Sequence, residues 1–284
     1  MRMIRISAFA LLGFSLLGFF LLACQQVPKP KSIYFEALRD GNVQEVERHL
    51  HWGTPIDHSN KEGCTGLYLA SAAGQTALVE LFLEKNAKVD AKTHKGDQAL
   101  LAAVRSNHAA IVRRLIEHGA SVNAQDPDGG SALVYALHLE NDALVSWLLD
   151  HKADVNLANA KKESPLHAAA KRGQSQFAKA LLERGAAIDA QDKQGMTPLH
   201  LACKGGKTPL VDLLLKRGAK PRIGDIQGMT PLHWATRREI AELLLDHKAP
   251  INARCHKGWT PMHSADYLGH GGVVKFLRSR GGKP

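Results

Sequence analysis

A four-residue motif recurs at a fixed interval along this 284-residue chain, and this periodicity constrains the fold more than any other feature. The motif is Ser/Thr-Pro-Leu/Met-His. Its four copies start at Ser164, Thr197, Thr230 and Thr260, which are 33, 33 and 30 residues apart. Backward steps of 33 residues reach Ser131, Gln98, Thr65 and Ser32, each followed by a similar helical pattern. A repeat of this length buries its apolar face only against its neighbours, so we expect a stacked array.

One unit, residues 194–226, shows why each repeat should fold as two short helices. Thr197 is suited to cap the first helix, and Pro198 fits the first helical position, where its missing N–H costs nothing. The leucines within 210–214 recur at i, i+3 and i+4, which gives the second helix a buried face. Gly218 follows them and is expected to end that helix in the left-handed conformation. Aromatic residues are only 6% of the chain, so the core should be aliphatic.

The period and the motif together resemble the ankyrin repeat over residues 32–284. The resemblance implies an all-α solenoid of helix-turn-helix repeats joined by β-turn or hairpin fingers. It also implies that the motif histidines bond backbone groups between neighbouring fingers; these are His167, His200, His233 and His263. We expect a degenerate first repeat at 32–61, six internal repeats at 62–94, 95–127, 128–160, 161–193, 194–226 and 227–256, and a short last repeat at 257–284.

The chain departs from the repeat pattern in three places. Repeats 2 to 4 lack the full motif, so their bonds between fingers should differ. Repeat 7 is three residues short between Ala235 and Ile240, which predicts a shortened first helix or turn and a local change in curvature. The last repeat carries Lys275, Arg278 and Arg280, which make its outer end polar, as the end of a solenoid requires.

The N-terminus has the pattern of a secretion signal. Arg2 and Arg5 precede an uncharged, largely apolar stretch over residues 6–23. The stretch ends in Leu-Leu-Ala followed by Cys24, which resembles the lipobox of bacterial lipoproteins. This resemblance implies that 1–23 is a signal peptide and that Cys24 becomes a lipidated first residue. A plain cleaved signal and a retained membrane helix are the alternatives.

Residues 24–31 would then form a lipidated cysteine and a tether. The two prolines of this segment favour an extended, semi-rigid spacer that holds the folded part a short distance off the membrane. Gln25 directly follows the cysteine. The absence of an Asp at this position resembles outer-membrane sorting in Gram-negative lipoproteins. We therefore expect a lipid-anchored protein of the bacterial cell envelope that faces the periplasm.

The sequence contains no motif for catalysis or metal binding. Four cysteines exclude a disulfide-built scaffold, and the 15 histidines include no zinc spacing. No nucleophile elbow, phosphate loop or triad is present. We expect no enzyme activity, no metal, no cofactor and no small-molecule substrate. Cys64, Cys203 and Cys255 should be free thiols.

Charge is distributed unevenly along the array. Residues 161–284 hold 22 Lys/Arg and 10 Asp/Glu, a balance of +12, whereas residues 25–160 hold 13 and 17, a balance of −4. The distal half is therefore strongly basic.

Proteins of the resembled family bind partners on a concave face built from finger tips and the ends of the first helices. The positions of this chain that match are Lys171, Arg172, Lys193, Met196, Lys204, Met229, Arg237, Arg238, Lys257 and Trp259. They predict a basic groove with an apolar rim across repeats 5–8. The alternative is ordinary solvated charge, with Met and Trp packed inside the fingers.

Two functions fit these features. The first is a membrane-tethered module that binds an acidic protein. The second is an envelope polyanion binder for lipid headgroups or polysaccharide, whose attraction would fall steeply with salt. Nucleic acid is the least favoured of the possible polyanions, because the secretion signal directs the chain out of the cytoplasm and no aromatic stacking platform is visible.

Overall fold

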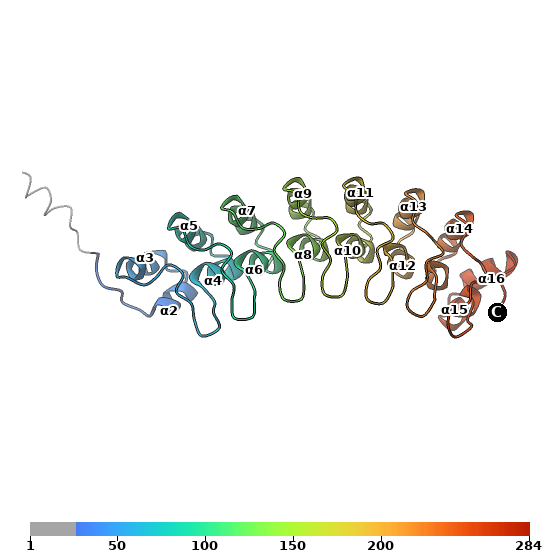
Figure 1. Ribbon diagram of the computed structural model, residues 1–284, viewed down its shortest axis with the longest axis horizontal. Helices are drawn as coiled ribbons and strands as arrows, with labels where there is room; N and C mark the ends of the chain where they lie inside the picture. The colour runs from blue at the N-terminus through green and yellow to red at the C-terminus, as the bar shows by residue number, and fades with distance from the viewer. Residues whose placement is uncertain (1–26) are drawn as a thin grey trace, which may run out of the picture.

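The computed structural model of the protein describes residues 27–284, so the predicted signal peptide and Cys24 lie outside the described residues. These residues form eight helical pairs stacked side by side in an arched array (Figure 1). The pairs are α2 (Tyr34–Arg39) with α3 (Val43–His51), α4 (Gly66–Ala73) with α5 (Thr76–Glu84), α6 (Ala99–Arg105) with α7 (Ala109–Glu117), α8 (Ala132–His138) with α9 (Asp142–Asp150), α10 (Pro165–Arg172) with α11 (Ser175–Glu183), α12 (Pro198–Lys204) with α13 (Thr208–Lys216), the 3₁₀ helix η1 (Pro231–Trp234) with α14 (Arg238–Asp246), and α15 (Pro261–Tyr267) with α16 (Gly271–Ser279).

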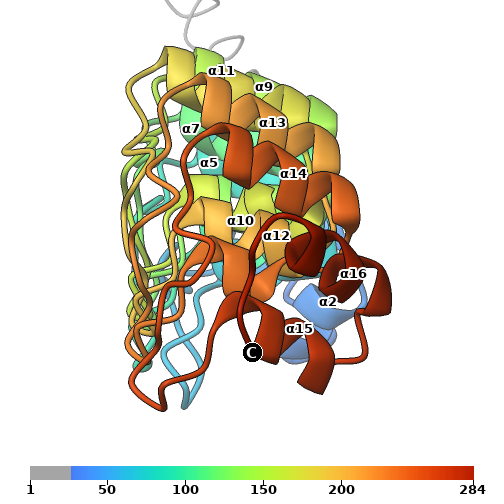
Figure 2. The same ribbon diagram turned by 90° about the vertical axis from the view of Figure 1, so that its right-hand side faces the viewer.

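The first helices of the pairs, here called the inner helices, form one row, and the second or outer helices form another (Figure 1). The loop before each inner helix projects as a finger, and the fingers make a separate layer in the end-on view of Figure 2. No strand occurs within residues 27–284; isolated bridges close three fingers at Ser59–Thr65, Lys92–Gln98 and Gln125–Ser131. The predicted all-α solenoid is confirmed.

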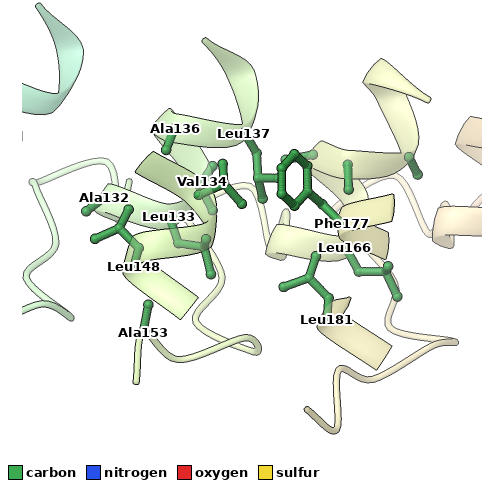
Figure 3. Close-up of a cluster of buried hydrophobic side chains, with 14 of the residues drawn as sticks. Ala132, Leu133, Val134, Ala136, Leu137, Leu148, Ala153, Leu166, Phe177 and Leu181 are labelled. Atoms are coloured by element: carbon green, nitrogen blue, oxygen red, sulfur yellow. The ribbon is translucent and has the colours of Figure 1, made fainter. Parts of the chain in front are cut away.

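The core runs continuously through the stack and is mainly aliphatic. Figure 3 shows Phe177 of α11 directed toward Leu137 of the preceding repeat, and both side chains are buried. Because each repeat buries its apolar side chains against the next one, neighbouring repeats share one core and stabilise each other.

The caps predicted for repeat 6 are present. The Thr197 hydroxyl accepts from the backbone N–H of His200 (3.4 Å), and Pro198 occupies the first helical position. Gly218, which follows the C-cap residue of α13, has φ +89°, where a side chain would be strained. Leu210 and Leu214 are buried, as their helical spacing predicts.

Motif histidines tie each of three repeats to the following finger. His167 Nε2 lies 3.0 Å from the Met196 carbonyl, His200 Nε2 3.0 Å from that of Met229, and His233 Nε2 3.1 Å from that of Trp259. Each Nδ1 accepts the backbone N–H of the capping Ser or Thr, so Nε2 carries the proton and donates to the carbonyl. Burial lowers the pKa of these three imidazoles, which favours the neutral form that this geometry needs.

The expectation for the fourth histidine is wrong. Within residues 27–284, His263 is exposed and bonds no carbonyl of a following finger, and its ring stacks on Trp259 at 4.6 Å between centroids. In the repeats without the motif, other side chains link the fingers: the Tyr68 hydroxyl donates to Asp97 (3.0 Å), and Arg105 bonds both Asp97 and Asp126.

The three-residue deletion in repeat 7 shortens the inner helix. This helix is the four-residue turn η1, whereas α12 in the preceding repeat has seven residues. Ala235 then leaves the helical conformation (φ −66°, ψ 116°), and α14 begins at Arg238. The outer helix keeps its full nine residues, so stacking on that side continues.

The segment before α2 packs against the first repeat, where an extended spacer was expected. The Glu45 carboxylate of α3 is buried and accepts the backbone N–H groups of Lys31 and Ser32. Hydrogen bonding by the Lys31 N–H, and then by Ser32 and Arg48, holds the pKa of Glu45 below its ordinary value. The tether is thus folded back onto the array from Val27 onward.

Candidate partner-binding surface

The predicted basic residues Lys171 and Arg172, at the end of α10, are both paired. Lys171 Nζ lies 2.8 Å from a Glu163 carboxylate oxygen, and Arg172 bonds Glu140 of the preceding repeat at 3.2 Å. His138 Nε2 lies 3.4 Å from the same Glu163 oxygen. Since Glu163 is buried at the base of its finger, Lys171 compensates a buried charge and is not free for a partner.

The Glu163 carboxyl has an unusually low pKa. Burial alone would raise it, but hydrogen bonds and charge from His138 and Lys171 outweigh burial and lower the pKa to about 2. The ionised form is therefore stabilised by folding, since the ordinary value is 4.5.

This pairing makes the fold sensitive to acid. Stability from Glu163 is fully present above pH 4.5 and is lost as pH falls toward 2, and the difference corresponds to about 3 kcal/mol. The wild-type chain should lose this stability between pH 5 and 2 relative to Glu163→Gln, measured by urea unfolding at several pH values. A constant difference between the two chains would contradict it. The comparison removes the separate loss from the buried histidines, which sets in as pH falls through their ordinary pKa near 6.5.

Apart from Arg238, which is described below, four other predicted cations are free of ion pairs within residues 27–284. They are Lys193, Lys204, Arg237 and Lys257, and all four are exposed. Lys204 Nζ lies 4.5 Å from the ring centroid of Trp234, and Lys257 Nζ lies 5.6 Å from that of Trp259. Positive charge over a half-buried aromatic ring, with no carboxylate paired to it, is available to an anionic partner.

The structure adds Trp234 to this surface. Its Nε1 donates to the Asp225 carboxylate in the finger that precedes η1 (3.1 Å), which fixes the indole under Lys204. The sequence held a signal for it: Trp234 follows a motif histidine, where the two preceding repeats have Ala168 and Leu201. A bulky polar aromatic at a position otherwise filled by small or aliphatic residues indicates a side chain that reaches beyond the core.

The predicted apolar rim is only partly present. Met196 is 7% exposed and packs within its finger, so it is not available to a partner. Met229 and Trp259 are half-buried. Ile226, which no sequence pattern indicated, is 56% exposed at the tip of the finger that precedes η1. It borders an open hollow of about 500 Å³ that Lys162 and Lys193 also line.

Arg238 lies apart from the other predicted cations. It is the first residue of the outer helix α14, and its guanidinium sits 5.5 Å from the ring centroid of Phe276 on α16. The deletion in repeat 7 starts the outer helix at this position, so only Arg237 continues the inner surface. We call the six residues Lys193, Lys204, Ile226, Trp234, Arg237 and Lys257 the distal surface.

Metal sites, membrane-spanning helices and reactive thiols are further features that could give residues 27–284 a function. Within residues 27–284, no group of three or more His, Cys, Asp or Glu side chains could hold a metal ion. No helix in that range is long and apolar enough to cross a membrane. Cys64, Cys203 and Cys255 are free, as predicted, and burial raises the pKa of the Cys203 thiol, which makes it unreactive.

Stacked helical pairs with finger loops and buried Thr-Pro-Leu-His motifs define a class of repeat protein that recognises other macromolecules on its surface. The family model for ankyrin repeats (three copies) matches residues 34–126, 67–159, 133–225 and 222–284, and the chain belongs to this family. The ankyrin repeat domain of human ASB11 is a similar solved structure, with 29% sequence identity and a TM-score of 0.66. The match covers 77% of this chain and 98% of that one. No curated protein matches the chain. Ankyrin-repeat proteins are typically interaction scaffolds without catalytic activity, so this chain is a protein–protein interaction module.

Proposed function

We propose that this protein is a lipid-anchored module of the bacterial cell envelope that binds an acidic protein through its distal surface. The observation that carries the proposal is the set of exposed, unpaired cations on repeats 5–8, two of which lie over tryptophan rings. The distal half has a balance of +12, so it attracts acidic partners at long range. The exposed Ile226 and the two tryptophans add the apolar contact that protein interfaces require and pure polyanion sites lack.

The stack suits this role mechanically. Its repeats share one core and keep their relative positions, so the surface loses little freedom when a partner binds. The proposal does not include Lys171 and Arg172, because their charges are already compensated within the array.

Lipid anchoring through Cys24 is the second part of the proposal. The wild-type protein isolated from its host should have an intact mass that begins at Cys24 and includes acyl chains, and Cys24→Ala should lose that acyl mass. Cys64→Ala is the matched control and should keep it. A wild-type chain that is cut without acyl mass would indicate a plain signal, and a chain that keeps residues 1–23 would indicate a retained membrane helix.

Polyanion binding is the competing function, because charge alone would attract lipid headgroups or polysaccharide. Capture from envelope extract on residues 27–284, at physiological and at raised salt, separates the two. A protein interface with an apolar centre should keep a discrete protein at raised salt. Release of all bound material by salt, with only lipid or polysaccharide in the eluate, would contradict a protein partner.

A further inference from the structure

The N-terminal segment is fastened to the end of the array at two points. Near α2, the Glu45 carboxylate accepts the backbone N–H groups of Lys31 and Ser32, the latter at 3.1 Å, and His49 Nε2 lies 2.8 Å from the Ser32 carbonyl. Further toward the N-terminus, the Trp52 indole donates to the carbonyl oxygens of Val27 (3.0 Å) and Pro28 (3.2 Å). These contacts bind residues 27–32 along α3, from Glu45 in its first turn to Trp52 just after its last residue.

The side chains left outside these contacts have a particular chemistry. Trp52 is 49% exposed although its N–H is satisfied, and Lys29 Nζ lies 5.5 Å from the ring centroid. Lys31 is also exposed, because only its backbone joins the buried carboxylate. Tryptophan beside lysine is the combination favoured at a bilayer surface, where the ring lies at headgroup depth and the cations meet anionic lipid.

The length of chain between these residues and the proposed anchor is short. Val27 is three residues after Cys24, and three residues span at most about 11 Å. Trp52 bonds directly to Val27, so an acylated Cys24 would keep the indole within one short reach of the membrane. A free tether would allow the array to move away from the bilayer. The contacts of the N-terminal segment with the array remove most of the tether's free length.

We propose that Lys29, Lys31 and Trp52 form a membrane-contacting face that lies on a bilayer containing anionic lipid. This inference rests on the proposed anchor at Cys24. It gives the array a fixed orientation: α2 and α3 sit at the membrane, and the distal surface lies on the repeats that lead away from it, from the finger before α12 toward the C-terminal end of the stack (Figure 1).

The test uses the full acylated chain, purified in detergent and reconstituted into vesicles of phosphatidylethanolamine and phosphatidylglycerol brominated near the headgroup. Bromine quenches indole fluorescence only at close approach. Trp52→Phe should remove most of the quenching seen with the wild-type protein. Trp147→Phe, a matched change on α9 in the middle of the array, should leave it unchanged.

A second variant tests the charges without touching the indole. Lys29→Glu with Lys31→Glu should lower the quenching at least twofold in these vesicles. Lys92→Glu with Lys95→Glu, an equal charge change at exposed positions of the finger before α6, should not.

Vesicle flotation separates the two levels of the proposal. Chains that do not float would overturn the anchor at Cys24, and the inference with it. Chains that float while Trp52 stays unquenched would leave the anchor in place and overturn the membrane-contacting face; a protein would then be the occupant of this end. Equal quenching in wild type and Trp52→Phe would overturn it as well.

Discussion

Substitution of His200 by Ala should lower the free energy of unfolding by about 3 kcal/mol, as expected for a buried side chain that leaves a cavity and unpaired polar groups. The imidazole is fully buried and connects the N–H of Thr197 with the carbonyl of Met229 in the next finger. Its loss leaves both groups without this partner and uncouples repeat 6 from repeat 7. Urea unfolding followed by circular dichroism at pH 7 measures the effect.

His263→Ala is the matched control, because this histidine occupies the same motif position in the last repeat. It is exposed and bonds no finger within residues 27–284, so its removal should change stability by no more than about 0.5 kcal/mol. Similar losses for the two variants would show that the bond to the next finger contributes little and that the motif histidine acts only as a helix cap.

Lys171→Glu should destabilise the array by about 3 kcal/mol, since it removes the partner of a buried carboxylate and places a like charge beside it. The Glu163 carboxylate then faces a second carboxylate where it had an ammonium group at 2.8 Å. Thermal and urea unfolding of the variant give the loss. The double variant Lys171→Glu with Glu163→Gln should recover part of it, because the buried negative charge is gone.

Lys193→Glu provides the comparison for an exposed cation without an ion pair. It should cost no more than about 0.5 kcal/mol. Equal losses at Lys193 and Lys171 would contradict the buried pair. The contrast also decides how binding is tested: reversal of Lys171 would weaken the fold and the interface together, whereas reversal of the unpaired cations affects the surface alone.

Much of the fold could be predicted because repeat architecture is local. Each unit repeats its own caps, such as Thr197 and Gly218, and packs against units at a constant sequence separation. The bonds of His167, His200 and His233 could be predicted for the same reason, since each of these histidines bonds a carbonyl 26 or 29 residues away. His263 is the exception: it is exposed within residues 27–284, and the motif alone does not tell a buried copy from an exposed one.

The surface could be predicted only in part. The positions of Lys193, Lys204, Arg237 and Lys257 came from the family pattern, and all four are exposed. Whether a cation is free depends on what the finger beside it carries, and the pairing of Lys171 with Glu163 became visible only with finger and helix end in place.

Two further features depend on local backbone detail. Arg238 turns to the outer helices because the deletion moves the start of α14. The contacts of the tether with the array could not be predicted, because its prolines favour an extended chain. Its partners Glu45 and Trp52 are 13 or more residues away in the sequence.

The binding of the captured protein to a four-charge variant tests the proposed function most directly. Lys193, Lys204, Arg237 and Lys257 are all changed to Glu in one variant. The control carries the same number of reversals on exposed cations of the N-terminal half, at Lys61, Lys88, Lys92 and Lys95. Calorimetric titration should show an affinity loss of about 100-fold for the distal variant, from about 3 kcal/mol of lost attraction and new repulsion, and little change for the control. Equal affinity of the distal variant and the wild-type protein, or equal losses in both variants, would contradict binding through the distal surface.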